Sequence, residues 1–248
     1  MAGRAVLIIA HPGHELLVHR WMELERPTVL VLTDGSGGAG ASRIEETRSG
    51  VAAAGGTPGG LFGLAPDRRF YDAILAADVG FFADVLARIE AELEGTDVVV
   101  SDAIEHFNPV HDLCSVLATL AARRIGAARY EFPIERPVDA NRLGSDAQVL
   151  RLTPSELARK LAAVAANGAL QAEVDRVMAE QPGVGAVEML VPVPPARPPL
   201  PTPAETPFYE VFGRERVASG RFGVLITYAE HVAPLVSALA AHSAAPAA

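Results

Sequence analysis

Four of the seven histidines lie just after two apolar runs of the chain, and they are its strongest candidates for metal chemistry. His11 and His14 follow the first run with a His-x-x-His spacing, whereas His106 and His111 follow another run much further along. Two imidazoles from one strand-to-helix turn and a third from a distant loop can hold zinc and leave one position open for water. We therefore predict a zinc site at His11, His14 and His111, although other divalent transition metals also suit three imidazoles. The alternative is that each histidine is an ordinary polar residue of a loop.

These histidines can meet only if the two apolar runs are neighbouring strands. Five apolar runs alternate with amphipathic segments, a pattern typical of right-handed strand–helix–strand units around a parallel sheet. Ligands bind at the carboxyl ends of such strands, where the strand order reverses, so we expect the first and fourth strands to be adjacent. The predicted strands are 5–10, 28–33, 60–63, 97–101 and 128–132, and the predicted helices are 14–25, 42–54, 71–93 and 110–124.

The alternation predicts a fold of the α/β class, with a Rossmann-like, doubly wound, mainly parallel sheet and helices on both faces. We expect one domain over residues 1–242, because 248 residues are enough for one large core. Its core covers about residues 1–135, and a C-terminal elaboration covers residues 150–242. Residues 243–248 (SAAPAA) are predicted to be a disordered tail.

The C-terminal elaboration combines a strong helix signal with a proline-dense segment. The predicted helix covers residues 154–180, and Thr153 and Glu156 are placed as a capping box at its start. A strand is predicted over 187–193. The prolines of residues 191–207 exclude a helix and indicate an extended segment that crosses the domain.

Three motifs, in order along the chain, resemble those of a known enzyme family. Residues 10–15 read AHPGHE, which resembles the AHPDDE signature of the LmbE-like, PIG-L type zinc N-deacetylases. Residues 33–37 followed by Arg43 and Glu46 look like that family's TxG…R…E stretch. Residues 103–111, AIEHFNPVH, look like its AYEGGHPDH stretch. The resemblance covers about the first 130 residues.

The resemblance implies a hydrolase with one zinc ion that removes acetyl groups from N-acetylated amino sugars and related small molecules. It implies that His11 and His111 are metal ligands and that His14 stands at the third ligand position, where the family has an aspartate. Gly13 stands at the position of the family's general base. Asn108 stands where the family has a histidine that assists the oxyanion or the leaving group.

Because Gly13 cannot accept a proton, proton transfer must depend on other groups. Three neutral imidazoles leave the ion with its full charge, which acidifies water and lowers the demand for a base. We expect Glu105 to be the substitute proton acceptor, with His106 as the second choice. Asp34 and Asp102 are further candidates in the same crevice, although each could equally serve a turn or a helix dipole.

Asn108 is a further catalytic candidate, and Arg43 is a candidate for substrate binding. Asn108 can donate a hydrogen bond to an oxyanion. Arg43 can clamp an anionic or hydroxyl-rich substrate, or it can be an ordinary surface charge of its helix.

Residues 35–40 match G-x-G-x-x-G, which could indicate a dinucleotide site. The match follows the second strand, and residues 53–60 lack the acidic residue that the fingerprint requires, so a flexible rim is the better interpretation. Two other functions stay open: a non-hydrolytic protein that keeps the metal site and binds or transforms another metabolite, and a nucleotide-binding protein.

Composition excludes several classes of partner. The net charge of −9 disfavours nucleic acid, which needs a basic face. The single cysteine, Cys114, excludes an internal disulfide framework and fits a reducing compartment. The sequence has no recognisable targeting or membrane-spanning segment, so we expect a cytoplasmic protein with no membrane partner. The expected partner is a small N-acylated sugar-like molecule, and a homo-oligomer is compatible with these features.

Overall fold

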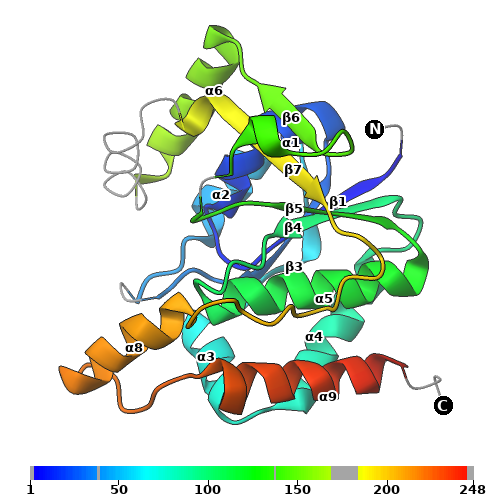
Figure 1. Cartoon of the computed structure of the whole chain (residues 1–248). Coiled ribbons are helices and arrows are strands. Elements are labelled where there is room, and N and C mark those ends of the chain that lie inside the picture. Colours follow the sequence, from blue (N-terminus) through cyan, green and yellow to red (C-terminus); the bar gives the residue numbers. More distant parts are fainter. Residues whose placement is uncertain (1–2, 38–39, 137, 169–183, 245–248) are drawn as a thin grey trace.

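The computed structural model has a seven-stranded sheet at its centre and helices on both faces, which confirms the predicted α/β architecture (Figure 1). It describes residues 3–37, 40–136, 138–168 and 184–244. The strand order is β3-β2-β1-β4-β5-β7-β6. The strands are β1 (Ala5–Ile9), β2 (Thr28–Thr33), β3 (Thr57–Ala65), β4 (Val98–Asp102), β5 (Ala128–Phe132), β6 (Gln148–Arg151) and β7 (Val187–Pro192).

The first five strands run parallel, whereas β7 is antiparallel to β5 and β6 is antiparallel to β7. β1 lies between β2 and β4, and Ile8 is opposite both Leu30 and Ser101. The predicted adjacency of the first and fourth strands is therefore confirmed. The sequence analysis does not predict β6, because its four residues, QVLR, are too few to give a periodic signal.

Side chains that alternate along β1 enter two apolar cores. Val6 and Ile8 pack with helices on one face of the sheet, and Leu7 and Ile9 pack with helices on the other. The helices of the first layer are α3 (Asp67–Leu75), α4 (Val79–Glu92), α5 (Pro109–Ile125) and α9 (Ala233–Ala244). Those of the second are α1 (His19–Glu25), α2 (Ile44–Ala53) and α6 (Pro154–Ala166). Cys114 on α5 is a buried member of the first core.

The single helix predicted over 71–93 was wrong, because the structure has α3 and α4 in its place. The chain turns at Ala77, whose φ of 48° is a left-handed conformation that cannot continue a helix. Asp78 then starts α4, because its side chain accepts a hydrogen bond from the N–H of Phe81 at 2.9 Å. Apolar spacing continues through the turn, so periodicity alone hid the break. The predicted first helix is likewise divided, into a 3-10 helix (His14–Val18) and α1.

The capping box at the start of α6 is confirmed. The N–H of Glu156 donates to Thr153 Oγ1 at 3.4 Å, and the N–H of Thr153 donates to Glu156 Oε2 at 2.8 Å. α6 ends at Ala166. Residues 169–180 of the predicted longer helix lie outside the described residues.

The proline-dense segment has no helix or strand after β7 and runs along α5 in Figure 1. Two of its predicted residues belong to β7, so the crossing covers 193–207 rather than 191–207. Arg197 fixes it to the sheet, because its Nη1 donates to Oε2 of the buried Glu131 at 2.8 Å and its Nη2 reaches the other carboxylate oxygen.

The chain continues into α8 (Phe208–Ala218), a π-helical turn (Tyr228–Val232) and α9. α9 reaches Ala244, so the first two residues of the predicted tail are helical. Residues 245–248 lie outside the described residues. Within the described ranges, no helix is both long and apolar enough to cross a membrane.

Glu188 on β7 ties the C-terminal elaboration to α1, and its loss should destabilise the fold. Its carboxylate accepts hydrogen bonds from Lys160 Nζ and from the N–H groups of Arg20 and Trp21, each at 2.9 Å. Glu188→Ala leaves a buried ammonium without its carboxylate, so we expect the free energy of unfolding to fall by about 3–5 kcal/mol. Urea denaturation measures the change. The exposed Glu45→Ala is the control, with an expected change below about 0.5 kcal/mol, and a similarly small change for Glu188→Ala would contradict this interpretation.

Candidate functional site

The structure brings the three predicted metal ligands together at the ends of β1 and β4. His11 follows β1, His14 begins the 3-10 helix, and His111 lies in the first turn of α5. The ring centroids are 5.4 Å apart for His11 and His14, 5.0 Å for His11 and His111, and 4.6 Å for His14 and His111. The adjacency of the two strands thus places side chains from distant parts of the sequence in one cluster, which we call the histidine cluster.

Asp67, the first residue of α3, holds His11 in place. Its Oδ1 lies 2.6 Å from His11 Nδ1, which is also 2.8 Å from Thr33 Oγ1. The second carboxylate oxygen accepts a hydrogen bond from the N–H of Gly37 at 2.7 Å. Burial raises the pKa of Asp67, but the hydrogen bond and charge of His11 outweigh it and lower the pKa to about 2. Burial lowers the pKa of His11, which favours the neutral ring that binds metals.

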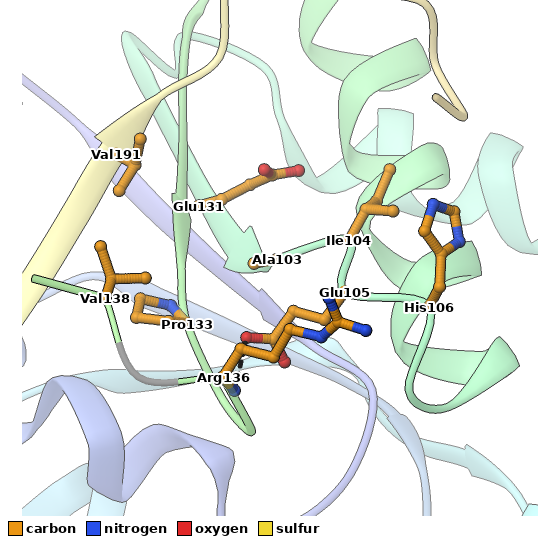
Figure 2. A pocket seen from close by; sticks show the side chains of 9 residues that line it. All are labelled: Ala103, Ile104, Glu105, His106, Glu131, Pro133, Arg136, Val138 and Val191. Atoms are coloured by element: carbon orange, nitrogen blue, oxygen red, sulfur yellow. Dashed lines mark hydrogen bonds between the residues drawn. The ribbon is translucent and has the colours of Figure 1, made fainter. Parts of the chain in front are cut away.

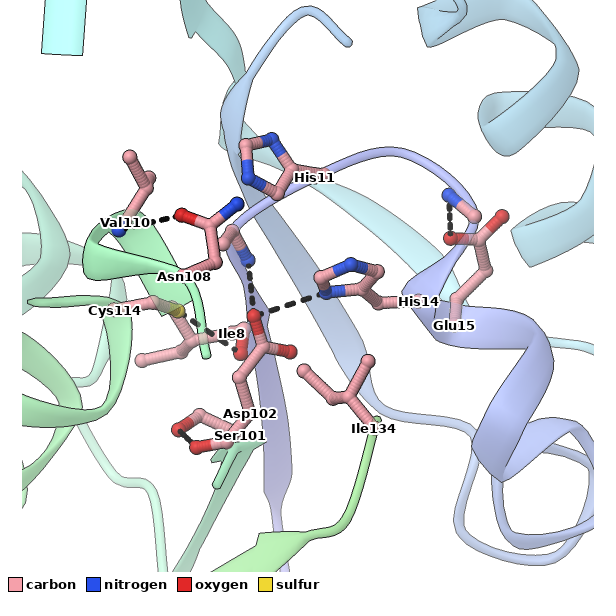
Figure 3. Close-up of polar contacts among 12 residues, drawn as sticks. Ile8, His11, His14, Glu15, Ser101, Asp102, Asn108, Val110, Cys114 and Ile134 are labelled. Carbon is pink, nitrogen blue, oxygen red and sulfur yellow. Dashed lines mark hydrogen bonds and ion pairs between the residues drawn. The ribbon is translucent and has the colours of Figure 1, made fainter. Parts of the chain in front are cut away.

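Asp102, the last residue of β4, holds His14 in a similar way (Figure 3). Its Oδ2 accepts a hydrogen bond from His14 Nδ1 at 3.0 Å and another from the N–H of Ala10 at 2.9 Å. Burial lowers the pKa of His14, but its contacts with Asp102 contribute to a net rise. For His111, burial and then the charges of the other two histidines lower the pKa well below its usual value.

The contacts with Asp67 and Asp102 engage Nδ1 of His11 and His14, so Nε2 is the nitrogen of each ring that could bind a metal. A carboxylate on one ring nitrogen commonly orients a histidine whose other nitrogen binds a metal. His11 Nε2 is buried and has no hydrogen-bond partner among the described residues. Among the described residues, no three His, Cys, Asp or Glu side chains form a coordinating group, so the three rings would have to shift to share one ion.

Asn108 and Tyr71 form a polar pair beside the histidine cluster. Asn108 Nδ2 donates to Tyr71 Oη at 3.1 Å, and Asn108 Oδ1 accepts the N–H of Val110 at 2.8 Å as the N-cap of α5. The Asn108 side chain lies next to the His11 ring in Figure 3. Burial raises the pKa of Tyr71 to about 12, so its hydroxyl stays protonated and able to donate.

Glu105, the predicted proton acceptor, binds the loop after β5. Its carboxylate accepts the N–H groups of Ile134 at 3.3 Å, Glu135 at 2.9 Å and Arg136 at 3.0 Å. Burial raises the pKa of Glu105, whereas these hydrogen bonds oppose the rise. The charge of Glu135 in this loop is one of the causes that raise the pKa of His14. The hydrogen bonds thus favour a positioning role for Glu105.

His106 and Glu105 line a cavity of about 300 Å³ (Figure 2). His106 has a left-handed φ of 53°, which is strained for a residue with a side chain. Asp112 Oδ1 stabilises this conformation, because it accepts the N–H groups of His106 at 3.1 Å and Glu105 at 3.2 Å. The His106 ring contacts Tyr228, with 5.8 Å between their centroids. The cavity is lined by Ala103, Ile104, Glu105, His106, Glu131, Pro133, Arg136, Val138 and Val191.

Asp34 and Arg43 make their polar contacts within their own loop. Asp34 Oδ1 accepts the N–H of Ser36 at 2.9 Å, and Arg43 Nε donates to the carbonyl of Gly35 at 3.0 Å. Among the described residues, neither side chain has a hydrogen bond or ion pair with the three histidines. The glycine-rich loop includes residues 38–39, which lie outside the described residues.

The sequence analysis missed Asp67 and Tyr71. Both come from the segment between the second and fourth predicted strands, and no spacing or motif connects them to the histidines. Asp102 was predicted to carry a proton or to serve a turn or a helix dipole, whereas in the structure it accepts a hydrogen bond from His14. Only the position of Asp102 at the end of a strand could have signalled that contact.

No family model and no curated protein matches the chain. Its fold is similar to that of a deacetylase triple mutant from teicoplanin biosynthesis, at 18% identity over 76% of this chain and 97% of that one, with a TM-score of 0.55. A zinc-inhibited form of teicoplanin deacetylase is 16% identical over 76% of this chain and 97% of that one, with a TM-score of 0.52. A deacetylase of an antimicrobial pseudoaglycone is 17% identical over 80% of this chain and 100% of that one, with a TM-score of 0.52. At this identity the likeness is one of fold.

Proposed function

We propose that this chain is a metal-dependent hydrolase that removes an N-acyl group, most simply acetyl, from a small amino-sugar-like substrate. The observation that supports this most strongly is the histidine cluster, in which carboxylates hold two of the three rings by Nδ1. The motifs that resemble the LmbE-like N-deacetylases, and a fold shared with solved deacetylases, point in the same direction.

In this proposal His11, His14 and His111 hold zinc. When bound, the ion supplies a Lewis acid for the acyl carbonyl and lowers the pKa of water. Asp67 and Asp102 keep a proton on Nδ1 of their histidines, which leaves Nε2 as the metal-binding atom. Both carboxylates also accept backbone N–H groups, so the rings are oriented before any ion arrives.

Asn108 and Tyr71 are proposed to bind the carbonyl oxygen of the acyl group as its negative charge develops. Each can turn one hydrogen toward that oxygen, and a fixed donor of this kind stabilises a tetrahedral transition state. Arg43 is proposed to bind hydroxyl or anionic groups of the substrate at the rim, because its guanidinium lies beside Gly35.

Gly13 stands at the position of the general base in the family that this chain resembles. The backbone conformation at this position suits glycine. Its φ is 106°, and its N–H donates to Oε2 of the buried Glu15 at 2.7 Å. This conformation would cost about 1–3 kcal/mol of stability for a residue with a side chain. The chain therefore relies on the ion, or on a carboxylate from another element, to activate water.

Replacement of Glu105 by glutamine tests which role Glu105 has. We expect kcat to fall by less than about tenfold and the acidic limb of the pH–rate profile to persist, because the amide oxygen still accepts backbone N–H groups. The melting temperature should fall slightly, because one backbone N–H of this part-buried loop loses its acceptor. A fall in kcat of about 10²–10⁴ together with loss of the acidic limb would instead make Glu105 the base. Glu45→Gln is the matched control.

Release of acetate from a panel of N-acetyl amino sugars, with and without added zinc, tests the proposed function. We expect release that depends on metal and disappears with a chelator. A protein that contains no metal and gains none on addition of zinc, iron, nickel or copper would exclude the proposal.

The second candidate is a non-hydrolytic protein that keeps the metal site, and Gly13 is the observation that favours it. In that case the purified protein binds metal tightly but releases no acetate from any amide. Activity that arises only in Gly13→Asp would support this candidate, because the variant restores the carboxylate at the base position.

A further inference from the structure

Exposed apolar side chains are concentrated in one segment of the chain. Within the described residues eight large apolar side chains are exposed, and six of them belong to residues 208–224. α8 carries most of them and projects away from the body of the molecule in Figure 1. Contiguous exposed apolar surface of this kind marks an interaction site. The six residues are Phe208, Val211, Phe212, Val217, Phe222 and Val224.

Three phenylalanine rings form a continuous row, which we call the aromatic strip: Phe208, Phe212 and Phe222. The rings of Phe208 and Phe212 have 6.0 Å between centroids and 22° between planes, and those of Phe212 and Phe222 have 6.3 Å and 72°. They are 40%, 37% and 48% exposed. Because a phenylalanine side chain offers about 200 Å², the three rings leave roughly 250 Å² of apolar surface open to a partner.

The protein already holds the aromatic strip in place. The N–H of Phe208 donates to the carbonyl of His106 at 2.8 Å, and the N–H of Tyr228 donates to Glu210 Oε1 at 2.8 Å. A Cβ atom at Gly213 would lie only 2.6 Å from Leu225 Cδ1, so glycine lets the segment after α8 pack closely against it. A partner therefore meets a preformed surface and does not have to order it.

The size of this surface fits a contact between two copies of the chain. A standard interface buries about 800 Å² on each partner, and about 65% of a homodimer interface is apolar. The aromatic strip together with the exposed Val211, Val217 and Val224 supplies roughly 400 Å² of apolar surface. The alkyl stems of the neighbouring arginines supply much of the remainder.

The charges of the same segment are self-complementary. Residues 205–224 carry three glutamates and three arginines. Two of the glutamates precede Phe212, whereas all three arginines follow it together with Glu215, so the two halves have opposite formal charges of −2 and +2. Glu205 before α8 and Arg221 after it are both exposed, and their sequence distances from Phe212 are similar. An anionic membrane would instead require an excess of basic residues.

A two-fold axis near Phe212 would use both features at once. It pairs α8 with the α8 of the second copy in antiparallel orientation, which places the acidic half of each segment against the basic half of the other. The two helix dipoles are then also antiparallel. In this arrangement Glu205 of one copy lies near Arg221 of the other, and the two aromatic strips cover each other.

We propose that the chain forms a two-fold symmetric homodimer in which the aromatic strips pack together with their α8 helices antiparallel. This inference goes beyond the proposed function and does not depend on it, because the oligomeric state is measured without metal or substrate.

Sedimentation equilibrium of the full chain at micromolar concentrations tests the dimer. We expect the wild-type protein to have twice the mass of one chain. Phe212→Ser should raise the dissociation constant of the dimer by about a hundredfold, because each dimer buries two copies of the ring. Leu24→Ser, which removes a similarly exposed apolar side chain from α1, is the matched control and should leave the dissociation constant unchanged.

A charge exchange tests the antiparallel orientation. Glu205→Arg should weaken the dimer by about tenfold, because two arginines then face each other at each end of the interface. Combination of Glu205→Arg with Arg221→Glu should restore the wild-type dissociation constant, because each pair again has opposite charges. All of these positions are exposed, so circular dichroism should show an unchanged fold in every variant.

A wild-type protein that is monomeric at all concentrations would overturn the inference, as would a dimer that Phe212→Ser leaves intact. A Phe212-dependent dimer that the charge exchange fails to restore would overturn the antiparallel arrangement. Monomeric protein that co-sediments with phosphatidylcholine–phosphatidylglycerol vesicles, and no longer does so in Phe212→Ser, would assign the aromatic strip to a membrane instead.

Discussion

Replacement of His111 by alanine is expected to weaken zinc binding by at least about a thousandfold. His111 is the proposed ligand from α5, and without it the proposed site would keep only His11 and His14 as protein donors. Loss of a group that merely orients a ligand already costs about 10–100-fold in metal affinity, so loss of a ligand must cost more. Metal-dependent activity should disappear with the ion.

Equilibrium dialysis against a competing chelator, with metal analysis of the dialysed protein, measures this effect. His242→Ala, at an exposed position on α9, is the matched control and should keep full metal content. Asp102→Asn should be intermediate, because it weakens the hold on His14 but removes no ligand. Full zinc content in both the His111→Ala and His14→Ala proteins would exclude the three-histidine site.

The sheet and its topology could be predicted because buried parallel strands have an unmistakable pattern. β1 is apolar throughout and β4 is apolar over Val98–Val100, and every residue of both strands is buried, so neither could be an edge strand. The turn at Ala77 could not be predicted in this way. Its left-handed backbone occurs within a continuous apolar spacing, and only the Asp78 cap marks the break.

The histidine cluster could be predicted because each member follows a strand whose place in the sheet was already inferred. The groups that orient the histidine rings could not be predicted. Asp67 meets His11 only because β3 and α3 return the chain to the end of β1, and this is a tertiary contact without a sequence signal. Glu105 illustrates the opposite limit: its position in the sequence suggested a base, but three backbone N–H groups already bind its carboxylate.

Replacement of Tyr71 by phenylalanine is expected to lower kcat by about 100-fold and to leave metal content unchanged. The ring stays in the first core, so the fold is kept and only the hydroxyl is lost. That hydroxyl pairs with Asn108 and stays protonated at neutral pH, because burial raises its pKa to about 12. Loss of one oriented donor to a developing oxyanion typically costs 10²–10³-fold in kcat.

Steady-state kinetics with the best N-acetyl substrate separate this role from a structural one. A donor that acts in the transition state changes kcat and kcat/KM together, whereas a group that only binds substrate raises KM. Tyr130→Phe removes the same atom from β5 and should leave both constants unchanged. A Tyr71→Phe protein with the kcat of wild type would leave Asn108 as the proposed donor, and its amide would then be free of the hydroxyl that now holds it at 3.1 Å.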